Sequence, residues 1–256
     1  MILTERPHRT VLRAGWLFDG TEAHLKADPV VVLDGSKITS VDFGSVAAAA
    51  AADPDVMVDL GDVTLLPGLV DTHVHLGFDA SSNPVANLQA RNDAEVLVAM
   101  REAGRTALAG GVTTVRDLGD RDYLSLGLRD DEKMPTIVAA GPPITTTFGH
   151  CHFLGGVATA GTHGVRAAVR EHAERGVDVI KIMATGGQLT PGSHQHLAQF
   201  TTEEMTAAVE EAHRHGLPIT AHAHGTAGIR TPSQPGSTVS NTRASGPKMA
   251  STTPAT

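Results

Sequence analysis

Two histidines one residue apart, His73 and His75, end an apolar run and are the residues of this sequence best suited to metal chemistry. In a β-strand, residues i and i+2 share one face, so two imidazoles at this spacing can converge on one ion. The pair alone is a weak indication, because strand histidines are more often surface residues or buried structural residues. The interpretation therefore depends on the polar residues that follow.

Polar residues also stand at the ends of later apolar runs. Arg116 and Asp117 end one run, Lys181 lies inside a later one, and His222 and His224 end the last. In a parallel sheet with helical crossovers, functional residues gather beyond the carboxyl ends of the strands. These positions predict one shared site.

Lys181 is the least expected member, since an unpaired ammonium is costly to bury within the apolar run Ile180–Met183. Two ordinary explanations are an ion pair with Asp117 and a side chain that reaches solvent at the mouth of the site. The functional alternative is a lowered pKa, which makes the amine nucleophilic. The amine would then take up carbon dioxide and become a carbamate, a carboxylate-like ligand able to bridge two cations. Four imidazoles and one such group suit a divalent ion such as zinc.

The pattern of expected secondary structure around these residues changes near residue 65. Residues 9–65 alternate short apolar runs with turns, among them Asp19-Gly20 and Asp34-Gly35, and predict a small antiparallel β unit. From residue 65 onward, strands alternate with helices, which predicts a parallel sheet. The first of these strands is expected to be buried on both faces. The expected strands cover residues 65–75, 112–118, 136–140, 178–183 and 217–222.

Three helices are expected between these strands. Apolar residues at three- and four-residue spacing predict one helix within residues 83–109, ended by Gly110-Gly111. A second helix covers residues 165–175. A third follows the capping box of Thr201 and Glu204 and runs to residue 214. The alanine run at residues 47–52 predicts a helical or linker stretch.

Composition excludes several classes of function. The chain is 41% hydrophobic and 19% charged, with a formal net charge of −8 and only 3% aromatic residues, which argues against a nucleic-acid partner. Cys151 is the only cysteine, so no internal disulfide is possible. No apolar segment of 18 residues occurs, and we expect a soluble, cytoplasmic protein without a membrane partner. The oligomeric state stays open, a homo-oligomer included.

Four segments together resemble the amidohydrolase superfamily, and in particular its imidazolonepropionase-like and Xaa-Pro dipeptidase branch: residues 67–75, 111–117, 180–187 and 221–225. The resemblance implies an α/β fold, a (β/α)8 TIM-type barrel of which about five of eight strands are present. It also implies that residues 1–64 are half of a composite β-sandwich, that residues 65–230 are a partial barrel with the metal site, and that residues 231–256 are a non-native or disordered tail.

The resemblance also implies roles for individual residues. His73 and His75 would hold one metal, carbamylated Lys181 would bridge two, and His222 would serve the second; the cofactors would be two Zn²⁺ ions and carbon dioxide. Three further histidines match positions near the substrate: His150, His152 and His224. The implied activity is hydrolysis of an amide or peptide C–N bond in a small molecule or dipeptide, such as Xaa-Pro, by metal-activated hydroxide. The alternatives are an imidazolonepropionase-like cyclic amide hydrolase, an inactive fragment or pseudoenzyme, and adventitious metal binding.

The sequence departs from the family's pattern after Arg230. The family has a histidine that ends strand six and a catalytic aspartate that ends strand eight, but residues 225–256 contain no His, Asp or Glu. Read one base earlier, the codons of residues 231–242 permit His-Ala-Ile-Ala-Ala-Gly-Val-Asp-Ser-Val-Glu-His, which resembles the family's next helix end and sixth strand. We therefore expect a reading-frame slip that replaces the rest of the enzyme with a tail. Such truncation is expected to leave open sheet edges and to impair stability and activity.

Overall fold

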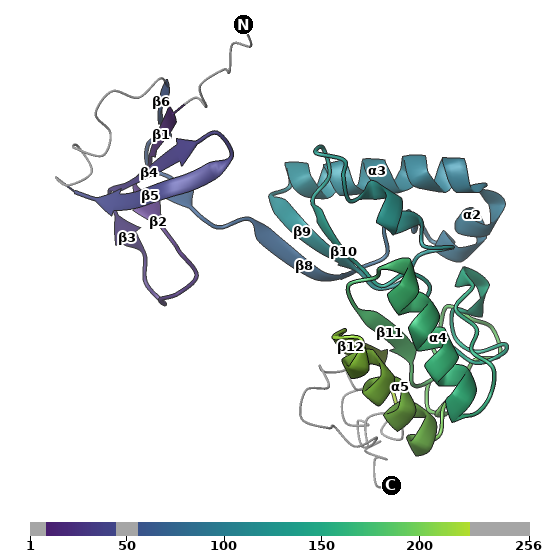
Figure 1. The fold of residues 1–256 in the computed structure, drawn as a ribbon. Helices are drawn as coiled ribbons and strands as arrows, with labels where there is room; N and C mark the ends of the chain where they lie inside the picture. The colour runs from purple at the N-terminus through teal and green to yellow at the C-terminus, as the bar shows by residue number, and fades with distance from the viewer. Residues whose placement is uncertain (1–8, 45–55, 226–256) are drawn as a thin grey trace, which may run out of the picture. The chain divides into compact units, whose positions relative to one another are not determined.

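The computed structural model of the chain describes residues 9–44 and 56–225 (Figure 1). The chain divides into two compact units between Gly68 and Leu69. The linker expected at residues 47–52, and the tail and reading-frame slip expected after Arg230, lie outside the described residues. The consequences expected from truncation therefore stay predictions.

The N-terminal unit contains seven described strands in two small sheets. One sheet has the order β5-β4-β1-β6 and the other the order β3-β2-β7. In chain order the strands are β1 (Arg9–Arg13), β2 (Trp16–Leu17), β3 (Lys26–Ala27), β4 (Pro29–Asp34), β5 (Lys37–Phe43), β6 (Val56–Asp59) and β7 (Thr64–Leu65).

The antiparallel prediction for this unit is only partly right. β4 pairs antiparallel with β1 and with β5, but β6 pairs parallel with β1, and β7 pairs parallel with β2. The tight turn at Asp34-Gly35, where Gly35 has a φ of 58°, joins β4 to β5 as expected. β6 and β7 return to their partners after long connections, and a long connection allows a strand to arrive in the parallel direction.

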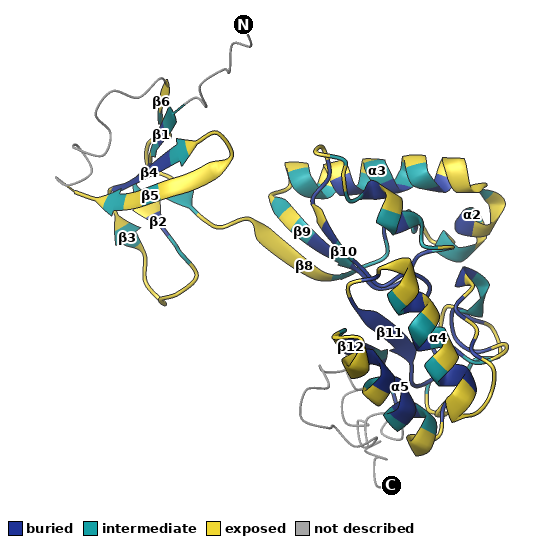
Figure 2. Cartoon of the chain, in the orientation of Figure 1, coloured by how far each residue is buried: buried dark blue, intermediate teal, exposed yellow. Residues whose placement is uncertain are grey.

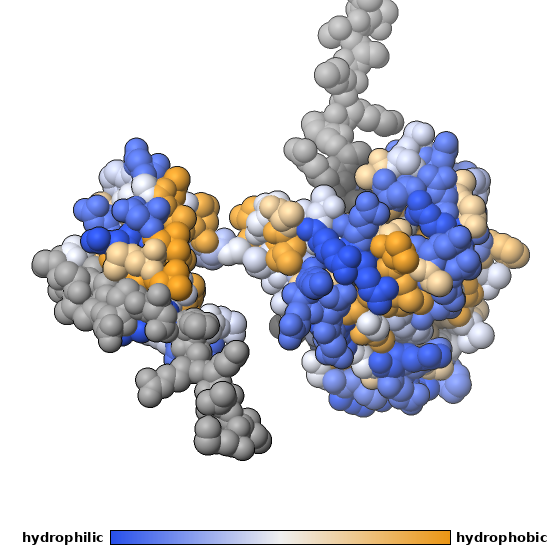
Figure 3. Space-filling model, turned by 90° about the horizontal axis from the view of Figure 1, so that it is seen from above, coloured by the Kyte–Doolittle hydropathy of each residue, from blue (hydrophilic) through white to orange (hydrophobic). Residues whose placement is uncertain are grey.

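One side of the N-terminal unit is apolar and exposed. Val11, Val30 and Val32 form its small buried core, whereas Ile38 and Phe43 of β5 remain 65% and 36% exposed. Figure 3 shows hydrophobic residues gathered on one side of this unit. The expected half of a β-sandwich stays a prediction for this unit.

Five parallel strands organise the second unit: β8 (Leu69–Val74), β9 (Val112–Asp117), β10 (Thr136–Ala139), β11 (Ile180–Met183) and β12 (Ile219–His222). β8, β9 and β10 form one sheet, and β11 pairs with β12. Ile144 extends the pairing toward β11, since its N–H donates to the Lys181 carbonyl over 2.7 Å and its carbonyl accepts the Met183 N–H over 2.8 Å. Within the described residues these strands form a three-stranded and a two-stranded parallel sheet, and no closed barrel is found.

The helices of the second unit follow the strands in the expected alternation. They are α2 (Pro84–Ala90), α3 (Asp93–Ala109), α4 (Thr162–Arg175) and α5 (Thr202–Arg214), with short 3-10 turns η1 (Leu124–Leu128) and η2 (His152–Leu154). Among the described helices, none is long and apolar enough to cross a membrane.

The prediction of a single helix within residues 83–109 is wrong, because the helix is interrupted between α2 and α3. Asn92 starts a new helix there: its side chain accepts the Glu95 N–H over 3.1 Å, and the Glu95 carboxylate accepts the Asn92 N–H over 2.9 Å. Gly111, with a φ of 87°, follows the end of α3 as expected. A local capping box thus overrides a periodic apolar pattern.

β11 lies at the centre of the larger core. Ile180 and Ile182 pack with Val165 of α4 and Met205 of α5, and all four residues of the strand are buried (Figure 2). Burial of each such side chain stabilises the fold by roughly 1.5 to 3 kcal/mol. The strand that carries Lys181 is therefore held rigidly on both faces.

The prediction that β8 is buried on both faces is wrong. Leu69 and Val70 are 54% and 61% exposed, and Figure 2 shows β8 largely in the colour of exposed residues. β8 pairs with β9 on one side and lies at the edge of the described sheet, so its side chains have fewer neighbours than those of the inner strands.

The capping box of α5 offers a test of the local structure that carries β12. The Thr201 hydroxyl accepts the Glu204 N–H over 3.2 Å, so Thr201→Ala is expected to lower the free energy of unfolding by about 1 kcal/mol. Thr206→Ala is the control, since the exposed Thr206 hydroxyl only donates to the Thr202 carbonyl within the helix; we expect a change below about 0.5 kcal/mol. Chemical denaturation followed by circular dichroism measures both, and equal losses would contradict the capping role.

Candidate active site

The predicted site residues emerge where parallel strands end. His73 lies in β8 and His75 follows it, Asp117 ends β9, Lys181 lies in β11, and His222 ends β12. Parallel pairing gives the carboxyl ends of neighbouring strands the same direction. This is the side on which α/β barrels place their functional loops.

The predicted histidines form two groups of aromatic rings. The centroids of His73 and His75 lie 5.3 Å apart in an edge-on arrangement. The ring of His222 lies 4.6 Å from that of His150 and 4.6 Å from that of His224. The structure therefore brings together side chains that are separated by more than seventy residues in the chain.

The orientation of His75 is fixed by the loop after β9. Its Nδ1 lies 2.9 Å from the Gly119 carbonyl, so Nδ1 carries the proton and Nε2 is the free acceptor of the neutral ring. A Cβ on Gly119 would lie 3.0 Å from this ring. The loop itself is held by Asp117, whose two carboxylate oxygens accept the N–H groups of Leu76 and Gly119, each over 3.0 Å.

The ion pair considered between Asp117 and Lys181 is not formed. Asp117 is fully buried, its oxygens accept backbone N–H groups, and burial raises its pKa above the ordinary range of a carboxyl. The second ordinary explanation also fails, because Lys181 is only 1% exposed and its side chain does not reach solvent. The Lys181 Nζ has no hydrogen-bond partner in the structure.

Burial sets the protonation of the groups around this amine. It lowers the pKa of Lys181 to about 8 and the pKa of His75 to about 4, where the charge of Lys181 adds to the effect. His150 has its pKa lowered to about 4 and His222 to about 3, in both cases first by burial and then by neighbouring histidines and Lys181. Three imidazoles are thus neutral at pH 7, the form in which histidine binds metals.

His150 is held by the loop that follows β11. The Thr190 hydroxyl lies 3.2 Å from His150 Nδ1 and accepts the Cys151 N–H over 2.9 Å. Gln199 accepts the His150 N–H over 2.5 Å and donates to the Met183 carbonyl over 2.8 Å. These contacts attach the loop of residues 148–152 to the end of the strand that carries Lys181.

The Gly186-Gly187 pair makes room for the histidines. A Cβ on Gly187 would lie 2.3 Å from His150 Nε2, so only glycine leaves space for the imidazole. The Gly186 carbonyl lies 3.3 Å from His222 Nε2. The preceding Thr185 accepts the His224 N–H over 3.0 Å.

The remaining predicted residue, His152, lies outside both ring groups. Its Nδ1 lies 2.9 Å from the Gly149 carbonyl, and its ring neighbours are Phe148 and Phe153, at 6.1 and 6.2 Å. It lines a separate cavity together with Thr190.

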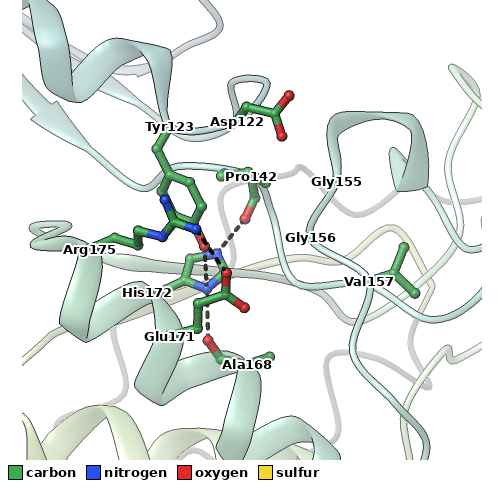
Figure 4. Close-up of a pocket in the computed structure, with 10 residues that line it drawn as sticks. All are labelled: Asp122, Tyr123, Pro142, Gly155, Gly156, Val157, Ala168, Glu171, His172 and Arg175. Carbon is green, nitrogen blue, oxygen red and sulfur yellow. Dashed lines mark hydrogen bonds and ion pairs between the residues drawn. The ribbon is translucent and has the colours of Figure 1, made fainter.

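A smaller cavity of about 140 Å³ lies beside α4 (Figure 4). Its wall contains His172, with Nε2 2.7 Å from the Pro142 carbonyl and Nδ1 2.8 Å from the Ala168 carbonyl. The Arg175 guanidinium stacks on the Tyr123 ring with its carbon 5.0 Å from the centroid. These contacts attach α4 to the turns after β9 and β10, and none of the predicted site histidines lines this cavity.

A preformed metal site of ordinary ligands is not present among the described residues. No three His, Cys, Asp or Glu side chains lie close enough together there to hold an ion. The predicted ligand set, however, takes one member from lysine. Neutral imidazoles beside a buried amine without a hydrogen-bond partner fit the donor chemistry of a zinc-type ion, provided that Lys181 supplies an oxygen ligand.

Several positioning residues escape sequence reasoning. Thr190 and Gln199 hold His150, and Thr185 holds His224, yet isolated threonines and glutamines carry no spacing signal. The Gly186-Gly187 pair is the exception, because adjacent glycines after a buried strand indicate that another group approaches the backbone closely. This pair lies within residues 180–187, one of the four segments that resemble the family.

The comparison with known proteins decides the family. The profile of the Amidohydrolase family matches residues 64–236, which is more than half of the chain. The chain belongs to the amidohydrolase family. The resemblance inferred from the four sequence segments is thereby confirmed.

Named relatives of this amidohydrolase are hydrolases of several kinds. Ochratoxinase of Aspergillus niger is 31% identical over 192 residues, covering 64% of this chain and 40% of the relative. Imidazolonepropionase of Arthrobacter sp. (strain FB24) is 36% identical over 104 residues, covering 40% of this chain and 22% of the relative. A solved Xaa-Pro dipeptidase with bound methionine superposes with a TM-score of 0.77 at 32% identity, covering 87% of this chain and 58% of that one. The chain thus spans about half or less of the length of these relatives.

The lowered pKa values predict histidines that do not titrate near neutrality. In the chain treated with a chelator, the ring proton signals of His75, His150 and His222 are expected to stay constant between about pH 7.5 and 5.5 in NMR spectra, because burial moves each pKa to about 4 or below. A titration midpoint near 6.5, the ordinary value for histidine, would contradict this environment.

The close approach of Gly187 to His150 predicts a local displacement. In Gly187→Ala the new methyl group occupies the position of the imidazole, so the ring signals of His150 and His222 should both shift in NMR spectra. Gly127→Ala is the matched control, because a Cβ there meets nothing within 4 Å. Unchanged His150 signals in Gly187→Ala would show that the ring does not lie against Gly187.

Proposed function

We propose that this chain carries the active site of a metal-dependent amidohydrolase that cleaves an amide or peptide C–N bond in a small, Xaa-Pro dipeptide-like substrate. The observation that carries the proposal is the Lys181 amine, which is buried and without a hydrogen-bond partner beside neutral histidines. A buried amine without a hydrogen-bond partner lowers the free energy of unfolding. A chemical role for Lys181 explains why such a residue stands at this position. The similarity to the Xaa-Pro dipeptidase structure supports the substrate class.

The proposed role of Lys181 begins with its free amine. With a pKa of about 8, part of the population is unprotonated near neutral pH. The nitrogen lone pair attacks the carbon of carbon dioxide, an N–C bond forms, and the electron pair of one C=O π bond moves to its oxygen. One N–H proton then passes to water, which leaves a carbamate. The neutral amine without a partner becomes an anionic group with two oxygens, which balances the charge of bound cations.

His73 and His75 would hold one divalent ion and His222 a second, and carbamylated Lys181 would supply an oxygen ligand. Zinc fits neutral imidazoles and a carboxylate-like oxygen. Such ions supply two effects, a lowered pKa of bound water and a polarised carbonyl.

The chain's own residues are proposed to prepare the substrate for this chemistry. The rings of His150 and His224 lie 4.6 Å from that of His222, and these two residues would hydrogen-bond the substrate beside the reacting bond. The Gly119 carbonyl fixes the tautomer of His75, so its Nε2 lone pair faces away from the loop. Burial keeps water away from these groups and strengthens each polar contact.

A cyclic amide hydrolase of the imidazolonepropionase type is the second candidate. The 36% identity to an imidazolonepropionase over 104 residues favours it. Both candidates need the same ligands and the same carbonyl chemistry, so the substrate separates them: a ring amide in one case and a linear amide in the other.

Replacement of Lys181 tests the proposal. Lys181→Met keeps the length of the side chain and removes the amine, so the carbamate signal seen by carbon NMR after addition of labelled bicarbonate is expected to disappear. Bound zinc, measured by elemental analysis, should fall from about two ions per chain to one or none, and amide hydrolysis should be lost. Lys133→Met removes an exposed lysine of the same unit and should change none of these readings.

The alternatives give different results in the same experiment. Unchanged zinc content in Lys181→Met indicates adventitious binding by a histidine-rich surface. Absence of both zinc and hydrolysis in the unsubstituted chain indicates an inactive fragment or pseudoenzyme. Either result contradicts the proposed function.

A further inference from the structure

A second cavity on the strand-end side of the sheet has no role in the site described so far. It has a volume of about 410 Å³ and is walled by the start of α2, by η2 and by the loop after β11. These segments follow β8, β10 and β11, the same strand ends that deliver the histidines. The volume falls in the range of small-molecule sites.

Thr190 connects this cavity to the histidines. Its side chain lies in the cavity wall, its hydroxyl is 3.2 Å from His150 Nδ1, and the ring of His150 packs 4.6 Å from that of His222. The cavity therefore adjoins the residue that holds His150.

The chemistry of the wall selects against charge. None of the eleven residues that line the cavity is a Lys, Arg, Asp or Glu. Apolar surface comes from six of them: Pro84, Val85, Ala86, Phe153, Leu189 and Pro191. An ionised group would lose hydration here without gaining a partner of opposite charge, which is costly.

His152 adds one directional contact to this apolar wall. Its Nδ1 faces the Gly149 carbonyl over 2.9 Å and carries a proton. In the neutral ring, Nε2 is then a hydrogen-bond acceptor. The wall thus offers hydrophobic contact and an acceptor for an N–H group, such as that of an amide.

We propose that this cavity is the subsite for an uncharged, apolar side group of the substrate, aromatic or branched aliphatic, adjoining the amide bond that is cleaved. This inference rests on the proposed function for the identity of the reaction, but its binding preference can be measured without turnover. It assigns specificity to Leu189 and Phe153 and places His152 as a contact of the amide N–H.

The test measures binding of three small amides that differ only in their side chain. N-acetyl-L-phenylalaninamide is expected to bind at least about tenfold more tightly than N-acetylglycinamide, because the phenyl ring leaves water for the apolar wall. N-acetyl-L-aspartic acid α-amide, which carries a side-chain carboxylate, should bind no better than the glycine compound. Calorimetry or saturation-transfer NMR on the full chain gives these affinities.

Leu189→Asp places a carboxylate in the cavity wall and should abolish the preference for the phenyl compound. Leu197→Asp is the matched control, since Leu197 lies in the same loop, is 60% exposed and does not line the cavity; its preference should match the unsubstituted chain. Leu189→Met, which keeps an apolar side chain, should also retain it. Equal binding of all three amides, or equal losses in both aspartate variants, would overturn the proposal.

Hydrolysis of Phe-Pro, Gly-Pro and Asp-Pro, dipeptides of the proposed substrate class with the same three side chains, is followed separately by release of proline. A binding preference without hydrolysis supports the subsite and contradicts the hydrolase function. Hydrolysis without any side-chain preference supports the function and overturns the subsite.

Discussion

The burial of a single amine constrains the second unit of this protein. Lys181 lies in β11, whose four residues are all buried between α4 and α5 and the neighbouring strands. A charged ammonium in this position would lack both water and a hydrogen-bond partner, so the surroundings favour the neutral amine. The same low-dielectric environment keeps His75, His150 and His222 unprotonated. Packing of the core thus decides the chemical state of the candidate site.

Backbone contacts, and not ion pairs, hold the groups around this amine. Asp117 accepts two backbone N–H groups and shapes the loop that orients His75. Thr190 and Gln199 do the same for the loop of His150. The hydrogen bonds of Thr190 and Gln199 fix the position of the His150 loop without adding a charged side chain. Glycine at position 187 completes the arrangement, because any side chain there would displace the imidazole.

Family membership explains why these features occur together. The amidohydrolase profile covers residues 64–236, and the similar proteins include an ochratoxinase and an imidazolonepropionase. Such diversity is common where a barrel supplies the metal-binding strand ends and variable loops supply specificity. The cavity beside Thr190 is built from the start of α2, from η2 and from the loop after β11, which all follow strand ends.

The sequence by itself determined the reactive residue types and the order of the elements around them. His73 and His75 stand at i and i+2, and the switch from short turns to alternating strands and helices indicated a parallel sheet; both patterns depend on local backbone geometry, which sequence encodes directly. Only the tertiary structure decided the rest. In the structure, the helix expected over residues 83–109 is divided at Asn92, β8 is exposed, and β6 pairs in parallel with β1. Lys181 has no ion pair with Asp117. The ring of His150 packs against that of His222, whereas His152 lies outside this group. These outcomes depend on contacts between distant segments, and spacing along the chain carries no information about which buried groups find a partner.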